Sequence, residues 1–257
     1  MSRYRHGDVA ALVLAAGQGT RMGSDLAKVL HPMAGQPLLA HVLSMLDRLG
    51  VGRRLVVIGH QADRVRAGFA QADVEWVLQA EQRGTGHAVL MAGPALEDFE
   101  GTLLVVCGDT PLMRASTLNT LLERHQESGA SVTVLSARVP DPTGYGRILR
   151  DADGRVTGIV EERDATEEQR RIDEINSATY AFEYKDLAQV LGRLTSRNSQ
   201  GEYYLTDSVR LLLDQGRPAE AWCGPDYREL LGINTVAQLE EAERIHSELV
   251  QSGEAAS

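Results

Sequence analysis

Short apolar runs alternate along this chain with longer segments in which apolar residues recur every three or four positions. The short runs predict strands at Ala10–Ala16, Arg53–Ile58, Val74–Gln79, Leu103–Cys107, Ser131–Val139, Arg147–Leu149, Val156–Val160, Ile175–Phe182 and Pro218–Cys223. The helical spacing predicts helices at Pro37–Leu49, Ala62–Ala70, Gly86–Ala92, Ala115–Ser128, Tyr184–Leu194, Thr206–Asp214 and Thr235–Val250. This alternation is typical of an α/β fold, and we expect a Rossmann-like, mixed and mostly parallel sheet flanked by helices.

Two segments in the middle of the chain have a different character. Asp151-Ala152-Asp153-Gly154 separates two short strand-like runs and predicts a hairpin turn. The segment Glu161–Glu174 is highly charged, so we expect a solvated loop or a short helix there.

The composition excludes several classes of protein. The chain has 257 residues and a formal net charge of −10, which argues against a nucleic-acid-binding surface. No apolar run approaches the ~20 residues that cross a bilayer, and the charged N-terminus is not followed by the apolar region of a signal peptide. Cys107 and Cys223 show no metal-ligand spacing, and we expect two free, buried thiols. We therefore expect a cytoplasmic protein without nucleic-acid or membrane partners.

The most informative segment follows the first expected strand. It reads Leu14-Ala15-Ala16-Gly17-Gln18-Gly19-Thr20-Arg21-Met22, and Lys28 comes six residues later. Glycines let the backbone approach a ligand and turn its N–H groups toward phosphate oxygens, while the two cations add positive charge. The segment lacks the Lys-Ser/Thr pair of a P-loop, and Gly23 comes one residue too late for the dinucleotide fingerprint. A glycine loop by itself also fits a tight strand-to-helix turn. With both cations beside it, the loop favours a site for a nucleoside triphosphate.

Further motifs extend this pattern over nearly the whole chain. In order they are Gln79-Ala80-Glu81-Gln82-Arg83-Gly84-Thr85-Gly86-His87-Ala88, Gly108-Asp109-Thr110-Pro111-Leu112, Asp141-Pro142-Thr143-Gly144-Tyr145-Gly146-Arg147-Ile148, Ile159-Val160-Glu161-Glu162, Ile175-Asn176-Ser177, Gly201-Glu202-Tyr203-Tyr204-Leu205-Thr206-Asp207 and Gly232-Ile233-Asn234. Together with the glycine loop, they resemble the sugar-1-phosphate nucleotidyltransferases. The resemblance is strongest to the uridylyltransferase domain of the bacterial N-acetylglucosamine-1-phosphate uridylyltransferases, and it runs from about Val9 to about Leu239.

The resemblance implies a complete set of site residues. Arg21 and Lys28 match the catalytic cations, and Asp109 and Asn234 match the ligands of a Mg²⁺ ion, which prefers oxygen donors. The implied substrate-binding residues are Leu14, Ala15, Ala16, Gly17, Gln79, Gly84 and Thr85 for the nucleotide, and Gly146, Glu161, Asn176, Tyr204 and Thr206 for the sugar phosphate.

Several of these residue types also have ordinary structural roles. Asp109 could be a turn residue, Asn234 and Thr85 could cap helices, and Tyr204 could belong to the core. We expect a structural role for His87, because the implied reaction gives it no proton to move.

The implied reaction converts UTP and N-acetylglucosamine 1-phosphate into UDP-N-acetylglucosamine and pyrophosphate. The attacking phosphate is already mostly ionised at neutral pH, because its second pKa is near ~6, so no general base is needed. Catalysis by positioning and electrostatic stabilisation is expected instead.

The chain departs from the family pattern at several positions. Cys107 stands where a tyrosine is usual, which puts the sugar specificity in question. Gln18 replaces a frequent cation, Ala27 a usual proline and Ala178 a common glycine, and Thr235 replaces an asparagine; without the proline we expect a less rigid segment at Lys28. Two alternatives therefore stay open: a nucleotidyltransferase for another sugar 1-phosphate or nucleotide, and a non-catalytic nucleotide-sugar-binding subunit.

The domain organisation follows from the extent of the resemblance. We assign residues 1–234 to a nucleotidyltransferase domain and residues 235–257 to a C-terminal helix and polar tail. No repeat of 20–50 residues is visible, so the β-helical acetyltransferase domain of the bifunctional bacterial enzymes and acetyl-CoA binding are not expected. The oligomeric state stays open.

Overall fold

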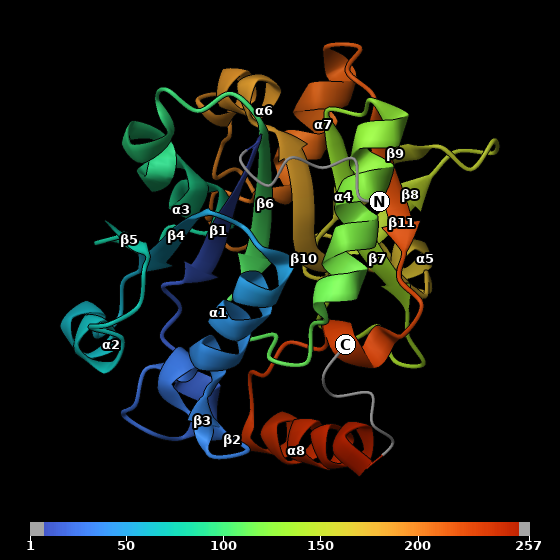
Figure 1. Cartoon of the computed structure of the whole chain (residues 1–257). Coiled ribbons are helices and arrows are strands. Elements are labelled where there is room, and N and C mark those ends of the chain that lie inside the picture. The colour runs from blue at the N-terminus through green and yellow to red at the C-terminus, as the bar shows by residue number, and fades with distance from the viewer. Residues whose placement is uncertain (1–7, 252–257) are drawn as a thin grey trace.

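The computed structural model describes residues 8–251, which fold around one large sheet (Figure 1). Within this range seven strands pair in the order β11-β7-β10-β6-β1-β4-β5, and the β8–β9 hairpin is attached to β10. The strands are β1 (Val9–Ala15), β4 (Arg53–Ile58), β5 (Glu75–Leu78), β6 (Thr102–Cys107), β7 (Val132–Arg138), β8 (Arg147–Arg150), β9 (Val156–Val160), β10 (Glu174–Glu183) and β11 (Ala219–Cys223). A separate two-stranded ribbon pairs β2 (Pro32–Met33) with β3 (Gln36–Pro37).

Most neighbouring strands of the large sheet run parallel. β1 is parallel to both β4 and β6, β4 is parallel to β5, and β11 is parallel to β7. β10 runs antiparallel to its neighbours β6 and β7, which makes the sheet mixed. The expected α/β class with a mixed, mostly parallel sheet is confirmed.

Helices cover both faces of this sheet (Figure 1). They are α1 (Leu38–Leu49), α2 (Ala62–Gly68), α3 (Thr85–Ala92), α4 (Ala115–Ser128), α5 (Glu167–Arg170), α6 (Tyr184–Leu191), α7 (Thr206–Asp214) and α8 (Val236–Gln251). Alternate residues of β1 point to opposite faces, as the strand period requires. Val9, Ala11 and Val13 are buried in the same cluster as the apolar residues of α1 and α4, whereas Ala10 and Leu12 are buried with those of α3, α6 and α7.

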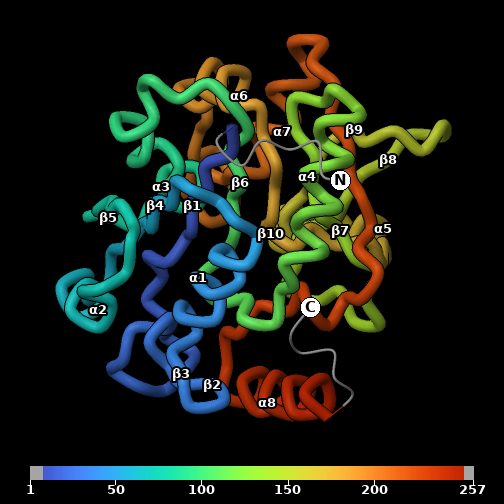
Figure 2. The backbone as a smooth tube through the Cα atoms, viewed as in Figure 1, coloured from blue at the N-terminus to red at the C-terminus, as the bar shows by residue number. Residues whose placement is uncertain are grey.

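The last helix packs against a smaller apolar cluster. Ala242, Ile245 and Leu249 of α8 are buried together with Met33 and Leu38. Figure 2 shows α8 beside the β2–β3 ribbon, at the end of the molecule where β1 and β6 also end. None of the helices described is long and apolar enough to cross a membrane.

The strand order creates a crevice at the carboxyl ends of β1 and β6. After β1 the chain continues to β4, which pairs with one edge of β1, whereas the later strand β6 pairs with the other edge of β1. In open α/β sheets this switch in strand order is where ligands bind. The glycine loop follows β1 and Gly108-Asp109 follows β6, so both motifs meet at this crevice.

One expectation about the two thiols is wrong. Both cysteines are free, but Cys223 is exposed because it lies at the end of β11, an edge strand with few covering residues. The apolar neighbours of Cys223 in the sequence suggested a buried strand, whereas an edge strand is covered on fewer sides. Cys107 ends the central strand β6 and is half-buried.

Candidate active site

The glycine loop folds back onto the segment that carries Lys28. Gly19 adopts a left-handed backbone conformation with φ 68°. A Cβ atom added to Gly19 would lie 2.7 Å from Cβ of Lys28, closer than side-chain atoms pack. Glycine is therefore required here both for the backbone conformation and for the close approach. The loop continues into a single 3₁₀ turn, Thr20–Met22, which holds Arg21 at the rim of the site.

Three functional groups that are far apart in the sequence meet beside this loop. Lys28 Nζ forms an ion pair with Asp109 Oδ2 and donates a hydrogen bond of 3.0 Å to Asn234 Oδ1. Arg21 also donates to Asn234 Oδ1, at 3.4 Å. The structure thus brings together both predicted cations and both predicted metal ligands.

The backbone around Asp109 fixes this carboxylate at the sheet edge. Gly108 N donates to Leu14 O at 2.9 Å, which ties the end of β6 to the end of β1. Ile233 N donates to Asp109 O at 2.9 Å and brings Asn234 alongside. Asn234 therefore reaches the site through a backbone contact that joins positions more than a hundred residues apart.

The donor set of the site fits a magnesium ion. Asp109 Oδ2 and Asn234 Oδ1 both contact the single Nζ atom of Lys28, so one small cation could contact both oxygens. Among residues 8–251 no group of three or more His, Cys, Asp or Glu side chains could hold a metal. A magnesium site agrees with this, because Mg²⁺ usually takes few protein ligands and completes its shell with phosphates and water.

A hydrogen-bonded glutamine holds the segment before Lys28. Ala27 is buried, and its N–H donates to Gln61 Oε1 at 3.1 Å, while Gln61 Nε2 donates to Asp25 O. The segment was expected to be less rigid without a proline at position 27. This expectation stays a prediction, to which the structure adds that Gln61 contacts the backbone on both sides of Leu26.

A pocket of about 490 Å³ opens from these groups toward β5. The predicted nucleotide residues that line it, together with Lys28 and Asp109, are Leu14, Ala15, Ala16, Gly17, Gln79, Gly84 and Thr85. This volume lies within the range of small-molecule sites, and the lining combines apolar walls with a few polar groups. The structure therefore brings the whole predicted nucleotide set to one pocket.

Gln79 is held in this pocket by two internal hydrogen bonds. Its Nε2 donates to Gly84 O and to His87 Nδ1, both at 3.0 Å, and the side chain is buried. The amide nitrogen is thereby occupied, and the Oε1 acceptor is left for a ligand. His87 thus has the structural role expected of it, and the structure adds its specific partner.

Gly84 and Thr85 join the pocket to the segment before α7. Gly84 has φ 105°, and an added Cβ would lie 2.6 Å from Tyr203 O. Thr85 begins α3 but does not cap it, because its Oγ1 accepts a hydrogen bond of 3.0 Å from Leu205 N. The possibility that Thr85 caps its own helix is therefore wrong; its hydroxyl links two segments instead.

Four of the five predicted sugar residues form a connected group. Thr206 Oγ1 donates to Glu161 Oε1 at 2.9 Å. A Cβ on Gly146 would lie 3.4 Å from Glu161 Oε2 and 3.5 Å from Asn176 Cβ, so Glu161 and Asn176 both lie next to Gly146. Tyr204 is buried, and its hydroxyl contacts Gln200 at 2.7 Å and Asp164 at 3.3 Å rather than this group.

The strand that carries Asn176 contains an unusual backbone conformation. Ala178 has φ 58°, in the left-handed region that favours glycine, and the pairing of β10 with β7 shifts between Asn176 and Thr179. Asn176 Oδ1 accepts from Ala178 N at 3.0 Å, and its Nδ2 donates to Tyr180 at 2.7 Å. A glycine at position 178 would adopt this bulge without strain, which explains why glycine suits this position; nothing in the structure explains the alanine.

Replacing Glu161 by glutamine should raise stability near neutral pH. Burial raises the pKa of the Glu161 carboxyl, although the Thr206 hydrogen bond lowers it in part. The folded chain then binds this proton more tightly than the unfolded chain, so wild-type stability falls as pH rises through the raised pKa. We expect Glu161→Gln to raise the melting temperature by about 2–4 °C at pH 7, as ~1 kcal/mol does in a domain of this size.

This gain should disappear on acidification, because the wild-type carboxyl then becomes neutral as well. Thermal unfolding from pH 7 down to the ordinary range of glutamate measures the difference. Glu127→Gln on the exposed end of α4 is the matched control and should change little. An equal gain at every pH would contradict the role given to the charge.

Cys107 should react slowly with alkylating reagents. Burial, and next the nearby Asp109 carboxylate, raise the pKa of the Cys107 thiol to about 12. Because the thiolate is the reacting species, we expect iodoacetamide at pH 8 to modify exposed Cys223 at least about tenfold faster. Mass spectrometry of timed digests measures both rates, and the Cys223→Ser variant should leave only the slow reaction. Equal rates at the two cysteines would be evidence against a protected thiol at Cys107.

The sequence also matches a family model. The model for the MobA-like NTP transferase domain matches residues 11–172, which include the glycine loop, Lys28, Asp109 and the β8–β9 hairpin. The chain belongs to this family. The NTP transferase is 51% identical over 242 residues to the bifunctional protein GlmU of Thermobifida fusca, covering 92% of the chain and 50% of that protein. It is 49% identical over 235 residues to the bifunctional protein GlmU of Geobacillus thermodenitrificans, covering 91% and 51%. The chain thus spans about half the length of the curated relatives it matches.

A solved structure supports the fold of this NTP transferase. The crystal structure of a UDP-glucose pyrophosphorylase in complex with UDP-glucose superposes with a TM-score of 0.76, covering 94% of this chain and 99% of that one. The sequence identity is 18%, so this likeness concerns the fold alone.

Gln61 and Gln82 support the site but were not assigned a site role from the sequence. Gln61 positions the backbone beside Lys28, and Gln82 Nε2 donates to Gln79 O at 3.0 Å while lining the pocket. Gln82 lies inside a recognised motif, so its place in the sequence could have pointed to it. Gln61 lies outside every motif and no local signal marks it.

Proposed function

We propose that this NTP transferase joins UTP to N-acetylglucosamine 1-phosphate, forming UDP-N-acetylglucosamine and releasing pyrophosphate. The convergence of Lys28, Asp109, Asn234 and Arg21 beside a glycine loop is the observation that carries the proposal. The family assignment and the motifs shared with uridylyltransferases support the same chemistry.

This reaction requires stabilisation of the negative charge on the phosphates rather than proton transfer. An oxygen of the sugar phosphate attacks the α-phosphorus of UTP, the bond to the β-phosphate oxygen breaks, and pyrophosphate leaves in line. Lys28 and Arg21 border the glycine loop, where they would hold the triphosphate and offset the negative charge on the leaving group. Asp109 and Asn234 would hold Mg²⁺, which supplies further neutralisation of the phosphates when bound.

The hydrogen bonds of Gln79 favour uracil over cytosine. Its Nε2 is occupied by Gly84 and His87, so Oε1 is the atom that faces a base in the pocket. Oε1 can accept from the N3–H of uracil, whereas N3 of cytosine carries no hydrogen and would repel it. The sugar phosphate would occupy the group formed by Gly146, Glu161, Asn176 and Thr206, where a carboxylate and an amide can recognise hydroxyl and N-acetyl groups.

Pyrophosphate release tests this function and its base specificity together. With Mg²⁺ we expect UTP and N-acetylglucosamine 1-phosphate to support turnover, and CTP or glucose 1-phosphate to be poorer substrates. Gln79→Leu should reduce the preference for UTP over CTP by about tenfold or more, since a hydrogen bond lost in a buried pocket costs at least ~1.4 kcal/mol.

Gln71→Leu, at an exposed turn position before the start of β5, serves as the matched control and should keep the wild-type preference. Absence of pyrophosphate release with every nucleotide and sugar phosphate would overturn the proposal. The free cysteines agree with a reducing cytoplasm, which we propose as the location of the reaction.

A further inference from the structure

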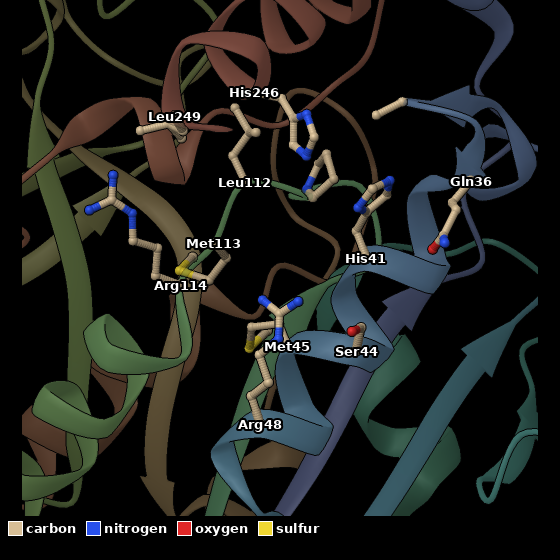
Figure 3. A pocket seen from close by; sticks show the side chains of 12 residues that line it. Gln36, His41, Ser44, Met45, Arg48, Leu112, Met113, Arg114, His246 and Leu249 are labelled. Atoms are coloured by element: carbon tan, nitrogen blue, oxygen red, sulfur yellow. The ribbon is translucent and has the colours of Figure 1, made fainter. Parts of the chain in front are cut away.

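A second cavity of about 340 Å³ lies outside the nucleotide pocket (Figure 3). Its walls come from α1, from residues 111–114 after β6, and from α8. Figure 3 shows His246 extending from α8 toward His41 of α1, with the Arg48 side chain rising from the next turns of α1. The residues of this cavity take no part in the chemistry proposed above.

The cavity is basic in an acidic protein. His41, Arg48, Arg114 and His246 line it, and no aspartate or glutamate between residues 8 and 251 does, although the chain has a net charge of −10. Arg114 pairs with Asp226 and Glu229 outside the cavity, at 3.8 and 3.6 Å, so its charge is largely balanced. Arg48 makes no ion pair or hydrogen bond with any residue between 8 and 251 and is the uncompensated cation of the cavity.

The imidazole groups add directional hydrogen bonding to this charge. His41 Nε2 lies 2.8 Å from Met33 O, a carbonyl that can only accept, so Nε2 carries a proton and Nδ1 is left for another partner. The rings of His41 and His246 stand edge to face with centroids 6.1 Å apart. Gln36 and Ser44 supply further donors, while Met45 and Leu112 provide apolar surface. Such a mixture suits an anionic group attached to a small organic body.

The walls of the cavity continue directly into the two oxygen ligands of the active site. Pro111 lies two residues after Asp109, and α8 begins two residues after Asn234. A molecule held between residues 111–114 and α8 would therefore contact the segments that position Asp109 and Asn234 relative to each other.

We propose that this cavity is a second binding site, for a small phosphate-bearing molecule held by Arg48 and His246. The phosphate would pair with the Arg48 guanidinium and accept a hydrogen bond from an N–H of the His246 imidazole, as charge-assisted contacts to phosphate do. The apolar wall at Met45 and Leu112 would cover the remainder of an organic phosphate.

Titration calorimetry without divalent metal tests the site directly. The probes are inorganic pyrophosphate and glucose 6-phosphate, added to the full chain carrying Lys28→Met so that anion binding at the nucleotide pocket is weakened. Arg48→Ala in this background should weaken binding by at least about tenfold, since a hydrogen bond to a charged group is lost. Tighter binding of glucose 6-phosphate would identify an organic phosphate, and tighter binding of pyrophosphate an inorganic one.

The controls separate this site from general charge effects. Arg64→Ala removes an exposed arginine of α2 and should leave binding unchanged. Ser44→Trp should fill the cavity and abolish binding while keeping every cation. Equal affinities in Arg48→Ala and Arg64→Ala, or full binding in Ser44→Trp, would overturn the proposal. The measurement involves no turnover, so a failure to bind these phosphates would not count against uridylyl transfer. Likewise, a failure of uridylyl transfer would not count against this second site.

Discussion

Replacing Asp109 by asparagine should lower the turnover of UTP and N-acetylglucosamine 1-phosphate by about 100- to 1000-fold. The side chain keeps its shape but loses the negative charge that pairs with Lys28 Nζ and that would hold Mg²⁺. Loss of one preorganised electrostatic group in an enclosed site typically has an effect of this size on kcat. Steady-state pyrophosphate release over a range of Mg²⁺ concentrations measures it, and higher Mg²⁺ should restore part of the rate.

A matched substitution shows whether the loss is specific. Asp153→Asn changes an exposed aspartate in the β8–β9 turn, far from the crevice along the sheet, and should keep the wild-type rate. Circular dichroism should show the same fold for both variants. Wild-type turnover by Asp109→Asn would show that this carboxylate is not a metal ligand in the reaction.

Lys28→Met should lower kcat by about 100-fold and change the KM for UTP much less. The ammonium group bridges Asp109 and Asn234 at the crevice, next to the glycine loop that would hold the phosphates. A cation that stabilises charge developing on the leaving group acts mainly in the transition state, so its removal affects kcat more than ground-state binding. Single-turnover kinetics with UTP in excess isolates this step.

The composition of the chain provides an unusually clean control for this residue. Lys28 and Lys185 are its two lysines, and Lys185 is an exposed residue at the start of α6. Lys185→Met should behave like the wild type. If Lys28→Met lost only affinity for UTP and kept its kcat, Lys28 would act in substrate binding and not in the transition state.

The architecture followed from local patterns because strands and helices in an α/β fold have distinct apolar periods. The strand Arg53–Ile58 and the helices Ala115–Ser128 and Thr206–Asp214 have the predicted bounds, since each is bounded by turn residues or glycine and has a continuous buried face. The pairing partners of β10 were not predicted. Antiparallel pairing of a strand with β6 and β7 depends on contacts between segments that are distant in the sequence.

Site residues that lie in sequence motifs could be predicted, whereas the side-chain contacts between distant segments could not. The glycine loop, Lys28 and Asp109 are adjacent to strand ends, so their meeting follows from the fold class. The hydrogen bond between Gln79 and His87 places a motif residue in a role that spacing alone does not reveal. Exposed Cys223 was misjudged because an apolar run does not distinguish an edge strand from a central one.

The contact between Ala27 and Gln61 limits which substitutions position 27 accepts. Proline has no N–H to donate, so introducing it there would leave Gln61 Oε1 without the hydrogen bond from position 27 in a partly buried corner. A proline at position 27 and the Gln61 side-chain amide are thus two alternative ways of holding the backbone beside Lys28. A sequence that has one of them does not need the other. Positions 27 and 61 are therefore expected to change together, as a pair, when this scaffold diversifies.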